Sequence, residues 1–338
     1  MSNIKIVDDT VKEEAEFAFN AGPGVEVDEL SHNAMGGTEL MKYGLHERLD
    51  PEVRDGVQII CSRVREVDPD RPSVLWLHDM FNDPEAQHLE DPESRARFSK
   101  LVYVSHFQKN TYEMVYGIKA SEGVVLPNAI EPIEPCEKAT DEIRLIYHTT
   151  PHRGLDILIP VFEELSKHYP TAVLDVYSSF EIYGWKDRDV DYEPIFERCR
   201  NHPKINYHGY RPNEEIREAL SKAHIFAFPS VWPETSCIAA MEAMSAGVAI
   251  VHSQYAALPE TIPSFGMSYT YHEDVTTHAN IFIGVLASAM DQIHSPEMKN
   301  RLQFQKAYAD SFYSWKNRTM QWNGLLRGIL NDSKANEG

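Results

Sequence analysis

The chain has 338 residues, of which 42% are apolar and 25% charged, so it has the composition of a soluble globular protein and the length expected of two domains. Its formal net charge of −20 argues against nucleic acid and against an anionic membrane surface as partners. No apolar run approaches a membrane span, and the four cysteines, which include no Cys-x-x-Cys pair, indicate neither a zinc site nor a disulfide framework, so we expect a cytoplasmic protein without membrane association.

The N-terminal region is expected to begin with a polar segment and a strand at 16–20, followed by a Gly-Pro-Gly turn. Gly36 and Gly37 then precede a helical pattern, whose expected inner face consists of Leu40, Met41, Leu45 and Leu49. Glycines at the start of a helix let a backbone approach a ligand closely, beside free N–H groups. The two glycines are therefore a candidate ligand loop, although a Gly-Gly pair by itself is more often only a turn.

Three short apolar runs in the first half of the chain are consistent with buried parallel strands: 57–61, 73–77 and 101–105. His78 directly follows the second run, at the carboxyl end of a strand, where open α/β sheets place their ligands. The alternative is a histidine that only packs beside Trp76. Ser105 ends the third run and precedes a helix predicted at 107–116. Residues 131–142, rich in proline and acidic side chains, are predicted to be an interdomain linker.

The second half of the chain opens with a strand predicted at 143–147 and a loop that leads into a helix. Thr149 and Arg153 lie in this loop, again at the carboxyl end of a strand. A guanidinium in such a loop can bind two oxygens of a phosphate group at once. A further strand is predicted at 172–177, and a strand that runs into a turn at 205–210. Tyr210 and Arg211 lie at the end of that turn and precede another helix.

The clearest local pattern is a βαβ unit. It begins with a strand at 225–228, and a helix is predicted to start near Ser236, where Thr235 and Ser236 can cap it. The body of this helix is rich in alanine and methionine, which favour helix, and Gly247 suits a left-handed C-cap. A second strand is predicted at 248–251.

Two carboxylates, Glu234 and Glu242, lie in this unit with seven residues between them. The first turn of the helix, at Thr235, Ser236 and Cys237, offers free backbone N–H groups to a phosphate. Carboxylates are strong acceptors for sugar hydroxyls. A ligand that carries a diphosphate and polyhydroxylated groups would suit this arrangement.

The C-terminal region is predicted to be helical at 280–293 and 296–312. An amphipathic tail follows at 312–326, and its expected apolar anchors are Trp315, Met320, Trp322 and Leu326.

The sequence Pro-Ser-x-x-x-Glu-x7-Glu-Ala-Met-x-x-Gly, followed by an apolar strand, resembles the nucleotide-sugar site of the retaining family 4 glycosyltransferases. The resemblance implies an α/β fold of the GT-B class, with two Rossmann-like parallel-sheet domains that face each other across a cleft. The first domain, on the acceptor side, is expected at 1–135, joined by a C-terminal helix at about 312–332, and the second, which binds the nucleotide-sugar, at 136–311.

The resemblance also implies roles for the candidate residues. Glu234 would contact the donor sugar and Glu242 the ribose, while Arg153 would neutralise the diphosphate. Where the family has a second basic residue in the loop of Arg153, this chain has His148 or a threonine, so Arg153 is expected to carry the charge alone with help from the Thr149 and Thr150 hydroxyls.

Other candidate residues correspond to family elements around the donor. His78 aligns with a histidine that approaches the donor sugar, and Gly36 and Gly37 match a Gly-Gly loop that meets the diphosphate. Tyr210 and Arg211 are candidates for contact with the base.

The expected function is therefore retaining transfer of a sugar from a UDP-, GDP- or ADP-sugar to the hydroxyl of a glycan or another acceptor. No metal or other cofactor is expected, because no Asp-x-Asp motif follows a strand. The alternatives are a GT-B sugar-nucleotide epimerase or phosphorylase, and a non-catalytic sugar-nucleotide-binding subunit of a glycosylation complex. The sequence leaves the base, the sugar, the acceptor and a homo-oligomeric state open.

Overall fold

The computed structural model describes residues 36–134 and 136–337, so the strand predicted at 16–20 and the Gly-Pro-Gly turn lie outside the described residues. The described chain forms two compact units. Of the described residues, the N-terminal unit contains 36–131, 234–238 and 310–337, and the C-terminal unit contains 132–233 and 239–309.

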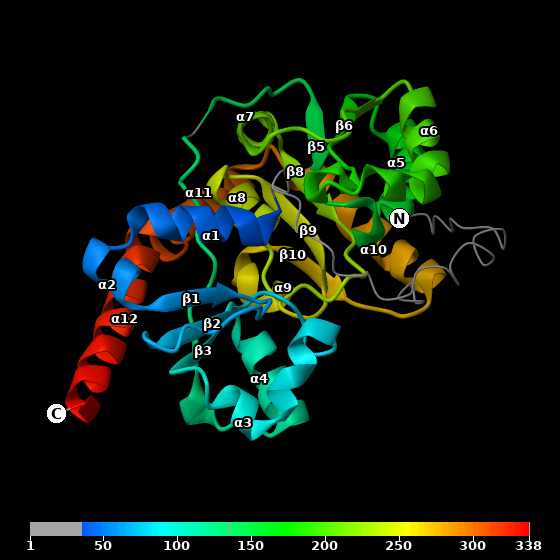
Figure 1. The fold of residues 1–338 in the computed structure, drawn as a ribbon. Helices are drawn as coiled ribbons and strands as arrows, with labels where there is room; N and C mark the ends of the chain where they lie inside the picture. The colour runs from blue at the N-terminus through cyan, green and yellow to red at the C-terminus, as the bar shows by residue number, and fades with distance from the viewer. Residues whose placement is uncertain (1–35, 135, 338) are drawn as a thin grey trace. The chain divides into compact units, whose positions relative to one another are not determined.

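The N-terminal unit is built on a four-stranded parallel sheet in the order β1-β2-β3-β4 (Figure 1). Its strands are β1 (Gln58–Cys61), β2 (Ser73–Leu77), β3 (Lys100–Tyr103) and β4 (Gly123–Val125). Its helices are α1 (Gly37–Arg48), α2 (Pro51–Gly56), α3 (Pro92–Arg95), α4 (His106–Tyr116) and α12 (Trp315–Glu337), with 3-10 turns η3 (Pro84–Glu90) and η4 (Ala120–Glu122). The three strands predicted in this region are confirmed, to within one or two residues at their ends.

Helices cover both faces of this sheet, which is why all five residues of β2 are buried. On one face, α1, α2 and α12 pack around Trp76, and Met41, Leu45 and Leu49 are buried there as the helical pattern predicted. On the other face, Tyr112 of α4 packs with the remaining core residues of β2 and β3. Ser105 is the N-cap of α4, because its hydroxyl accepts a hydrogen bond from the Gln108 N–H (3.0 Å).

Helix α12 belongs to the N-terminal unit although it ends the chain. Trp322 is fully buried and meets Trp76 edge-on, with ring centroids 4.9 Å apart. The prediction that Met320 is an apolar anchor is wrong, because its side chain is 67% exposed. Two residues along an α-helix turn the chain by about 200°, so Met320 and Trp322 face nearly opposite sides.

The C-terminal unit contains a six-stranded parallel sheet in the order β10-β9-β8-β5-β6-β7. Its strands are β5 (Ile143–Tyr147), β6 (Ala172–Val176), β7 (Ile205–Tyr207), β8 (Ile225–Phe228), β9 (Ala249–Gln254) and β10 (Met267–Thr270). Its helices are α5 (Leu155–His168), α6 (Glu193–Asn201), α7 (Asn213–Lys222), α8 (Ile238–Ser245), α9 (Leu258–Thr261), α10 (Val275–Gln292) and α11 (Pro296–Phe312). Its 3-10 turns are η5 (Pro151–Arg153), η6 (Phe180–Tyr183), η7 (Lys186–Tyr192) and η8 (Pro263–Phe265).

The direction of strand addition reverses beside β5. The chain builds β5, β6 and β7 towards one edge and then returns to add β8, β9 and β10 on the other side of β5. The loops after β5 and β8 therefore leave the sheet side by side at its carboxyl edge. In open α/β sheets this reversal point is the usual ligand position.

Replacing Trp322 with alanine should destabilise the N-terminal unit by about 3–5 kcal/mol, because a large side chain is removed from a closed core. Met320→Ala, two residues earlier on the same helix, should change the free energy of unfolding by less than about 0.5 kcal/mol. Urea unfolding followed by tryptophan fluorescence and circular dichroism measures both. Equal losses in the two variants would contradict the packing described for α12.

Candidate functional site

The loops after β5 and β8 touch at the point where the sheet order reverses. Gly154 ends the β5 loop with φ +121°, and a Cβ atom there would lie 2.3 Å from the carbonyl oxygen of Pro229. Only glycine fits both this backbone conformation and this distance. The Pro229-Ser230 segment after β8 is fixed in turn, because the Ser253 hydroxyl donates to the Ser230 carbonyl (2.6 Å).

Arg153 is anchored above this junction. Its Nε donates to Oγ1 of Thr150 (3.0 Å) and its Nη2 to the hydroxyl of Tyr183 (3.4 Å). Thr150 is itself buried, and its carbonyl accepts from the Tyr147 hydroxyl (3.0 Å). A half-buried guanidinium held by two neighbours is well suited to bind a phosphate group, because little conformational entropy remains to be lost.

Several buried polar atoms at this edge of the sheet have no hydrogen-bond partner among the described residues. They belong to the loops after β5 and β6: Nε2 of His148, Oγ1 of Thr149, Nδ1 of His152 and Oγ of Ser178. Burial lowers the pKa of His148 to about 3 and that of His152 well below its usual value, with Arg153 and Arg188 adding to the shift at His152. Both imidazoles are therefore neutral near pH 7. Unsatisfied buried polar atoms are rare, and a group of them at a ligand edge indicates a polar ligand.

Glu242 lies on α8 and is only 5% exposed. One of its oxygens, Oε1, accepts from Nδ2 of Asn213 (3.1 Å) and from Nη1 of Arg217 (3.1 Å). Burial raises the pKa of Glu242, and the bonds from Asn213 and Arg217 oppose this shift. Nη2 of Arg217 also donates to the Pro132 carbonyl (3.0 Å), where the chain enters this unit. These bonds hold the carboxylate in place.

The sequence reasoning missed Asn213 and Arg217. They are four residues apart on α7, which places them on one face of that helix, and this spacing was the available signal. The predicted residues Tyr210 and Arg211 come just before Asn213, so the loop that carries the base candidates leads directly into the helix that supports Glu242. Arg211 itself is exposed and pairs with Glu215 (3.5 Å).

The start of α8 differs from the prediction. The helix begins at Ile238 rather than near Ser236, and Oγ of Ser236 has no partner among the described residues, so Ser236 does not cap it. The Thr235 hydroxyl donates to the His78 carbonyl (2.7 Å) within the N-terminal unit. Cys237 is buried next to these residues. The three residues therefore precede the helix and do not form its first turn.

Gly36 and Gly37 occupy the start of α1 in the same unit. Gly36 is the N-cap residue, and a Cβ atom on Gly37 would lie 3.1 Å from Cδ1 of Ile238. The glycine pair therefore allows α1 to approach the segment 234–238 closely. Glu234 of that segment is 4% exposed.

His78 packs on Trp76, with ring centroids 4.5 Å apart, which is the contact that the alternative interpretation of this histidine predicted. That packing leaves both ring nitrogens of His78 without a partner among the described residues, and burial lowers its pKa to about 3. The backbone N–H of His78 donates to Oγ of Ser62 (3.0 Å). Ser62 itself adopts a left-handed backbone conformation with φ +56°. Strain of this kind at a strand end is typical of functional sites, and sequence reasoning did not single out Ser62.

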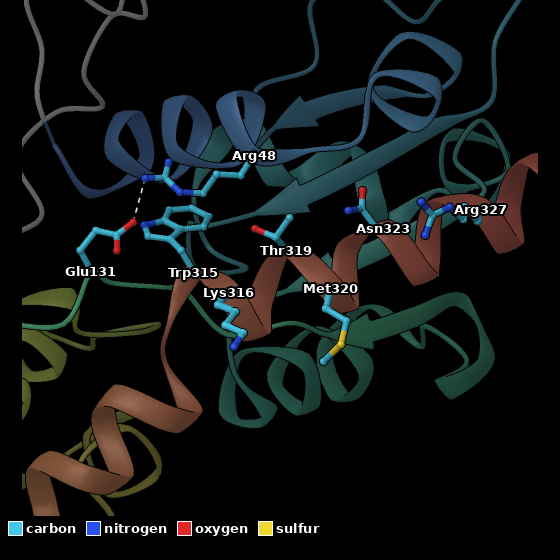
Figure 2. A pocket seen from close by; sticks show the side chains of 8 residues that line it. All are labelled: Arg48, Glu131, Trp315, Lys316, Thr319, Met320, Asn323 and Arg327. Atoms are coloured by element: carbon cyan, nitrogen blue, oxygen red, sulfur yellow. Dashed lines mark hydrogen bonds and ion pairs between the residues drawn. The ribbon is translucent and has the colours of Figure 1, made fainter.

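The N-terminal unit also has an open recess of about 610 Å³ along α12 (Figure 2). Arg48 and Glu131 form an ion pair in it (2.8 Å), and the Arg48 guanidinium lies over the ring of Trp315. Arg48 is at the carboxyl end of α1, whereas the two glycines are at its amino end. None of the predicted site residues lines this recess, which is therefore separate from the candidate site.

The predicted site residues thus fall into two groups, each described within its own unit. The C-terminal unit holds Thr149, Arg153, Tyr210, Arg211 and Glu242, and the N-terminal unit holds Gly36, Gly37, His78, Glu234, Thr235, Ser236 and Cys237. Across residues 36–337, with residue 135 aside, no group of three or more His, Cys, Asp or Glu side chains is arranged to hold a metal ion. No helix in that part of the chain has the length and apolarity needed to cross a membrane.

Comparison with known proteins adds independent evidence. Residues 137–275 match the family model of the group 1 glycosyl transferases. A stretch of 172 residues, 48% of the chain, is 26% identical to one of the subunits of the human phosphatidylinositol N-acetylglucosaminyltransferase, and the chain spans about a third (33%) of that relative's length.

Solved structures are similar over more of the chain. A glycosyltransferase from Rickettsia africae ESF-5 has a TM-score of 0.67 at 15% identity, over 96% of this chain and 89% of that one. HepE from Anabaena, solved in complex with UDP-glucose, has a TM-score of 0.55 at 16% identity, over 78% of this chain and 72% of that one. These similarities establish the fold and confirm the predicted GT-B class with its two parallel-sheet α/β domains.

Arg217→Ala should destabilise the protein in a pH-dependent way. Without Arg217 the pKa of the buried Glu242 carboxyl rises further, because the ionised carboxylate loses the positive charge that stabilises it in the folded protein. A carboxyl pKa raised by folding weakens stability as the pH rises from the unfolded pKa through the folded one. The loss relative to wild type should reach about 1–3 kcal/mol near pH 7.5 and be smaller near pH 5.

Urea unfolding at both pH values measures this difference. Lys222→Ala, which removes an exposed partner of Glu218 from the same helix, should cause less than about 0.5 kcal/mol of change at either pH. A loss in Arg217→Ala that is equal at both pH values would contradict the support of Glu242 by Arg217.

Proposed function

From the premise that residues 137–275 belong to the group 1 glycosyltransferases and that the chain has the GT-B fold, we propose that this protein transfers a sugar from a nucleotide-sugar to an acceptor hydroxyl. The proposed transfer retains the anomeric configuration and needs no metal. The observation that supports it best is the buried Glu242 carboxylate on α8, the helix that follows the Pro-Ser strand end. Asn213 and Arg217 of α7 orient this carboxylate.

In the C-terminal unit, the proposed role of Arg153 is to bind the diphosphate of the donor. The Thr149 hydroxyl and the neutral His148 imidazole lie in the same loop and have unsatisfied polar atoms for further phosphate oxygens. The Glu242 carboxylate, positioned through Oε1 by Asn213 and Arg217, is the proposed acceptor for ribose hydroxyls. Tyr210 and Arg211 are the proposed contacts to the base.

In the N-terminal unit, Glu234 and His78 are the proposed contacts to the sugar. With a pKa of about 3, His78 stays neutral at pH 7, so one ring nitrogen can donate to a sugar hydroxyl while the other accepts. The backbone N–H groups of Thr235, Ser236 and Cys237, with the Gly36-Gly37 loop, are the proposed neutral donors to phosphate.

The chemical step needs stabilisation of the negative charge that develops on the leaving diphosphate. A guanidinium fixed in advance by Thr150 and Tyr183 supplies it without reorganisation during the reaction, which is the main source of such electrostatic catalysis. The leaving phosphate oxygen is then the proposed base for the acceptor hydroxyl on the same face of the sugar. That route requires no dedicated carboxylate pair.

UDP-sugars are the first donors to test, because the Anabaena neighbour was solved with UDP-glucose. GDP- and ADP-sugars complete the screen, with glycans and simple glycosides as acceptors. The isolated chain with a bound donor should show a raised melting temperature, and it should release nucleoside diphosphate in the presence of EDTA. Turnover abolished by EDTA and restored by a divalent metal would overturn the metal-independent part of the proposal.

A second candidate is a sugar-nucleotide-binding subunit of a larger transferase, because the human relative is named as a subunit. Donor binding by the isolated chain without release of nucleoside diphosphate or free sugar would favour this role. Conversion of the donor into an isomer without transfer would favour an epimerase. The anomeric configuration of a transfer product, read by NMR, tests retention directly.

Arg153→Ala should lower kcat/KM for sugar transfer by about 100-fold or more, which corresponds to about 3 kcal/mol of transition-state stabilisation. Arg198→Ala serves as the control, because Arg198 forms an exposed ion pair with Glu163 in the same unit and should stay within about two-fold of wild type. Nucleoside diphosphate release under initial-rate conditions gives both values. Similar activities in the two variants would remove Arg153 from the reaction.

A further inference from the structure

An aromatic surface lies at the carboxyl edge of the C-terminal sheet, beyond the strands that form the core. We call it the aromatic shelf, and it comprises His152, Phe180, Tyr183, Trp185 and Trp232. These residues come from the loops after β5, β6 and β8, which are neighbours in the sheet. The shelf is therefore assembled by the same strand order that creates the candidate ligand edge.

The rings of the shelf form two contacting groups, which the Arg188 side chain links. His152 stacks on Phe180 with ring centroids 5.2 Å apart and 12° between the planes, and its other neighbour, Trp232, meets it edge-on at 4.5 Å. Tyr183 and Trp185 pack at 5.3 Å. The Arg188 guanidinium lies over both Phe180 and Trp185, at 5.0 and 5.4 Å from the ring centroids. These contacts hold the rings in a fixed arrangement.

Core packing does not account for the shelf. Phe180 is buried and supports it from below, but Trp232 is 45% exposed. An apolar surface made of adjoining aromatic rings marks an interaction site more often than a single exposed side chain does. Nδ1 of His152 is buried without a partner among the described residues, so a polar atom also lies unsatisfied within the aromatic surface. An exposed indole beside an unsatisfied polar atom offers an apolar surface and a polar anchor, the two features that binding sites for small polar molecules combine.

The shelf is continuous with the proposed diphosphate residue. Arg153 follows His152 directly in the loop, and its Nη2 donates to the Tyr183 hydroxyl (3.4 Å). A molecule on the shelf therefore lies next to the group that would hold the leaving phosphate.

On the basis of the proposed transferase function, we infer that the aromatic shelf binds a pyranose ring of a saccharide acceptor. A pyranose has apolar C–H faces that cover an aromatic ring, and hydroxyls at its rim that require donors and acceptors. Trp232 supplies the flat face, while the His152 imidazole and the Arg188 guanidinium supply polar atoms beside it. A rigid indole binds such a face with little loss of conformational entropy.

The occupant is the acceptor ring and not the donor sugar, because the two candidate positions differ in exposure. Glu234, the proposed donor-sugar contact, is 4% exposed, which suits a small group enclosed with its diphosphate. Trp232 lies open to solvent, which allows a glycan to extend away from the protein. The proposal therefore assigns Trp232 to acceptor specificity, and the acceptor class to saccharides.

The test uses Trp232→Ala and Trp232→Phe in the full chain, with Phe304→Ala as control. Phe304 is also exposed (71%), but it lies on α11, which carries no candidate site residue. Two reactions are followed with each donor that binds: hydrolysis, with water as acceptor, and transfer to a panel of methyl hexopyranosides and linear trisaccharides. Trp232→Ala should raise the acceptor KM about ten-fold or more, while donor KM and the hydrolysis rate stay within about two-fold of wild type.

Trp232→Phe should recover most of the acceptor affinity, and Phe304→Ala should match wild type. Equal effects of Trp232→Ala on donor KM and on hydrolysis would place the donor sugar on the shelf and overturn the acceptor assignment. An unchanged acceptor KM in Trp232→Ala would overturn the shelf as a subsite.

If no donor is turned over, saturation-transfer NMR of the same saccharides still tests the shelf. Comparing wild type with Trp232→Ala then separates saccharide binding at the aromatic shelf from the proposed transferase function. Saccharide signals that require Trp232 would support the shelf even though the transferase function had failed. Signals of equal strength in both proteins, or none in wild type, would overturn the shelf.

Discussion

A buried carboxylate sets the arrangement of the C-terminal unit. Glu242 can remain inside the protein only because Asn213 and Arg217 satisfy one of its oxygens, and this requires α7 to lie against α8. Arg217 extends the constraint to the chain at Pro132 through a second hydrogen bond. An apolar residue on α8 would need none of these supports. The presence of a costly acid at this position is therefore a physical reason to assign it a function.

Glu242 is buried with hydrogen-bond partners, whereas several polar atoms at the carboxyl edges of the two sheets are buried without them. His148, Thr149 and His152 each bury an atom without a partner among the described residues, and His78 buries two. A folded protein normally satisfies such atoms within itself, because each one left unpaired costs about 1–3 kcal/mol. Their concentration at the ends of parallel strands is consistent with interactions that a bound ligand completes.

Charge at the candidate site is local and not a property of the whole molecule. The chain carries a net charge of −20, and burial keeps His148 and His78 neutral, each with a pKa of about 3. In the loop 148–154 the guanidinium of Arg153 is consequently the one permanent positive charge. Recognition of an anionic donor in this loop would therefore depend on its fixed geometry more than on a broad basic surface.

The sequence by itself determined most of the strands and helices, because their periodicity is a local pattern. The GT-B class followed from the resemblance carried by the motif between Pro229 and Gly247. The sequence could not determine that Met320 faces solvent while Trp322 meets Trp76, since that depends on which side of α12 the sheet occupies. Nor could it pair Arg217 with Glu242. Such contacts join residues far apart in the chain, and only the packing of the helices in the folded structure brings them together.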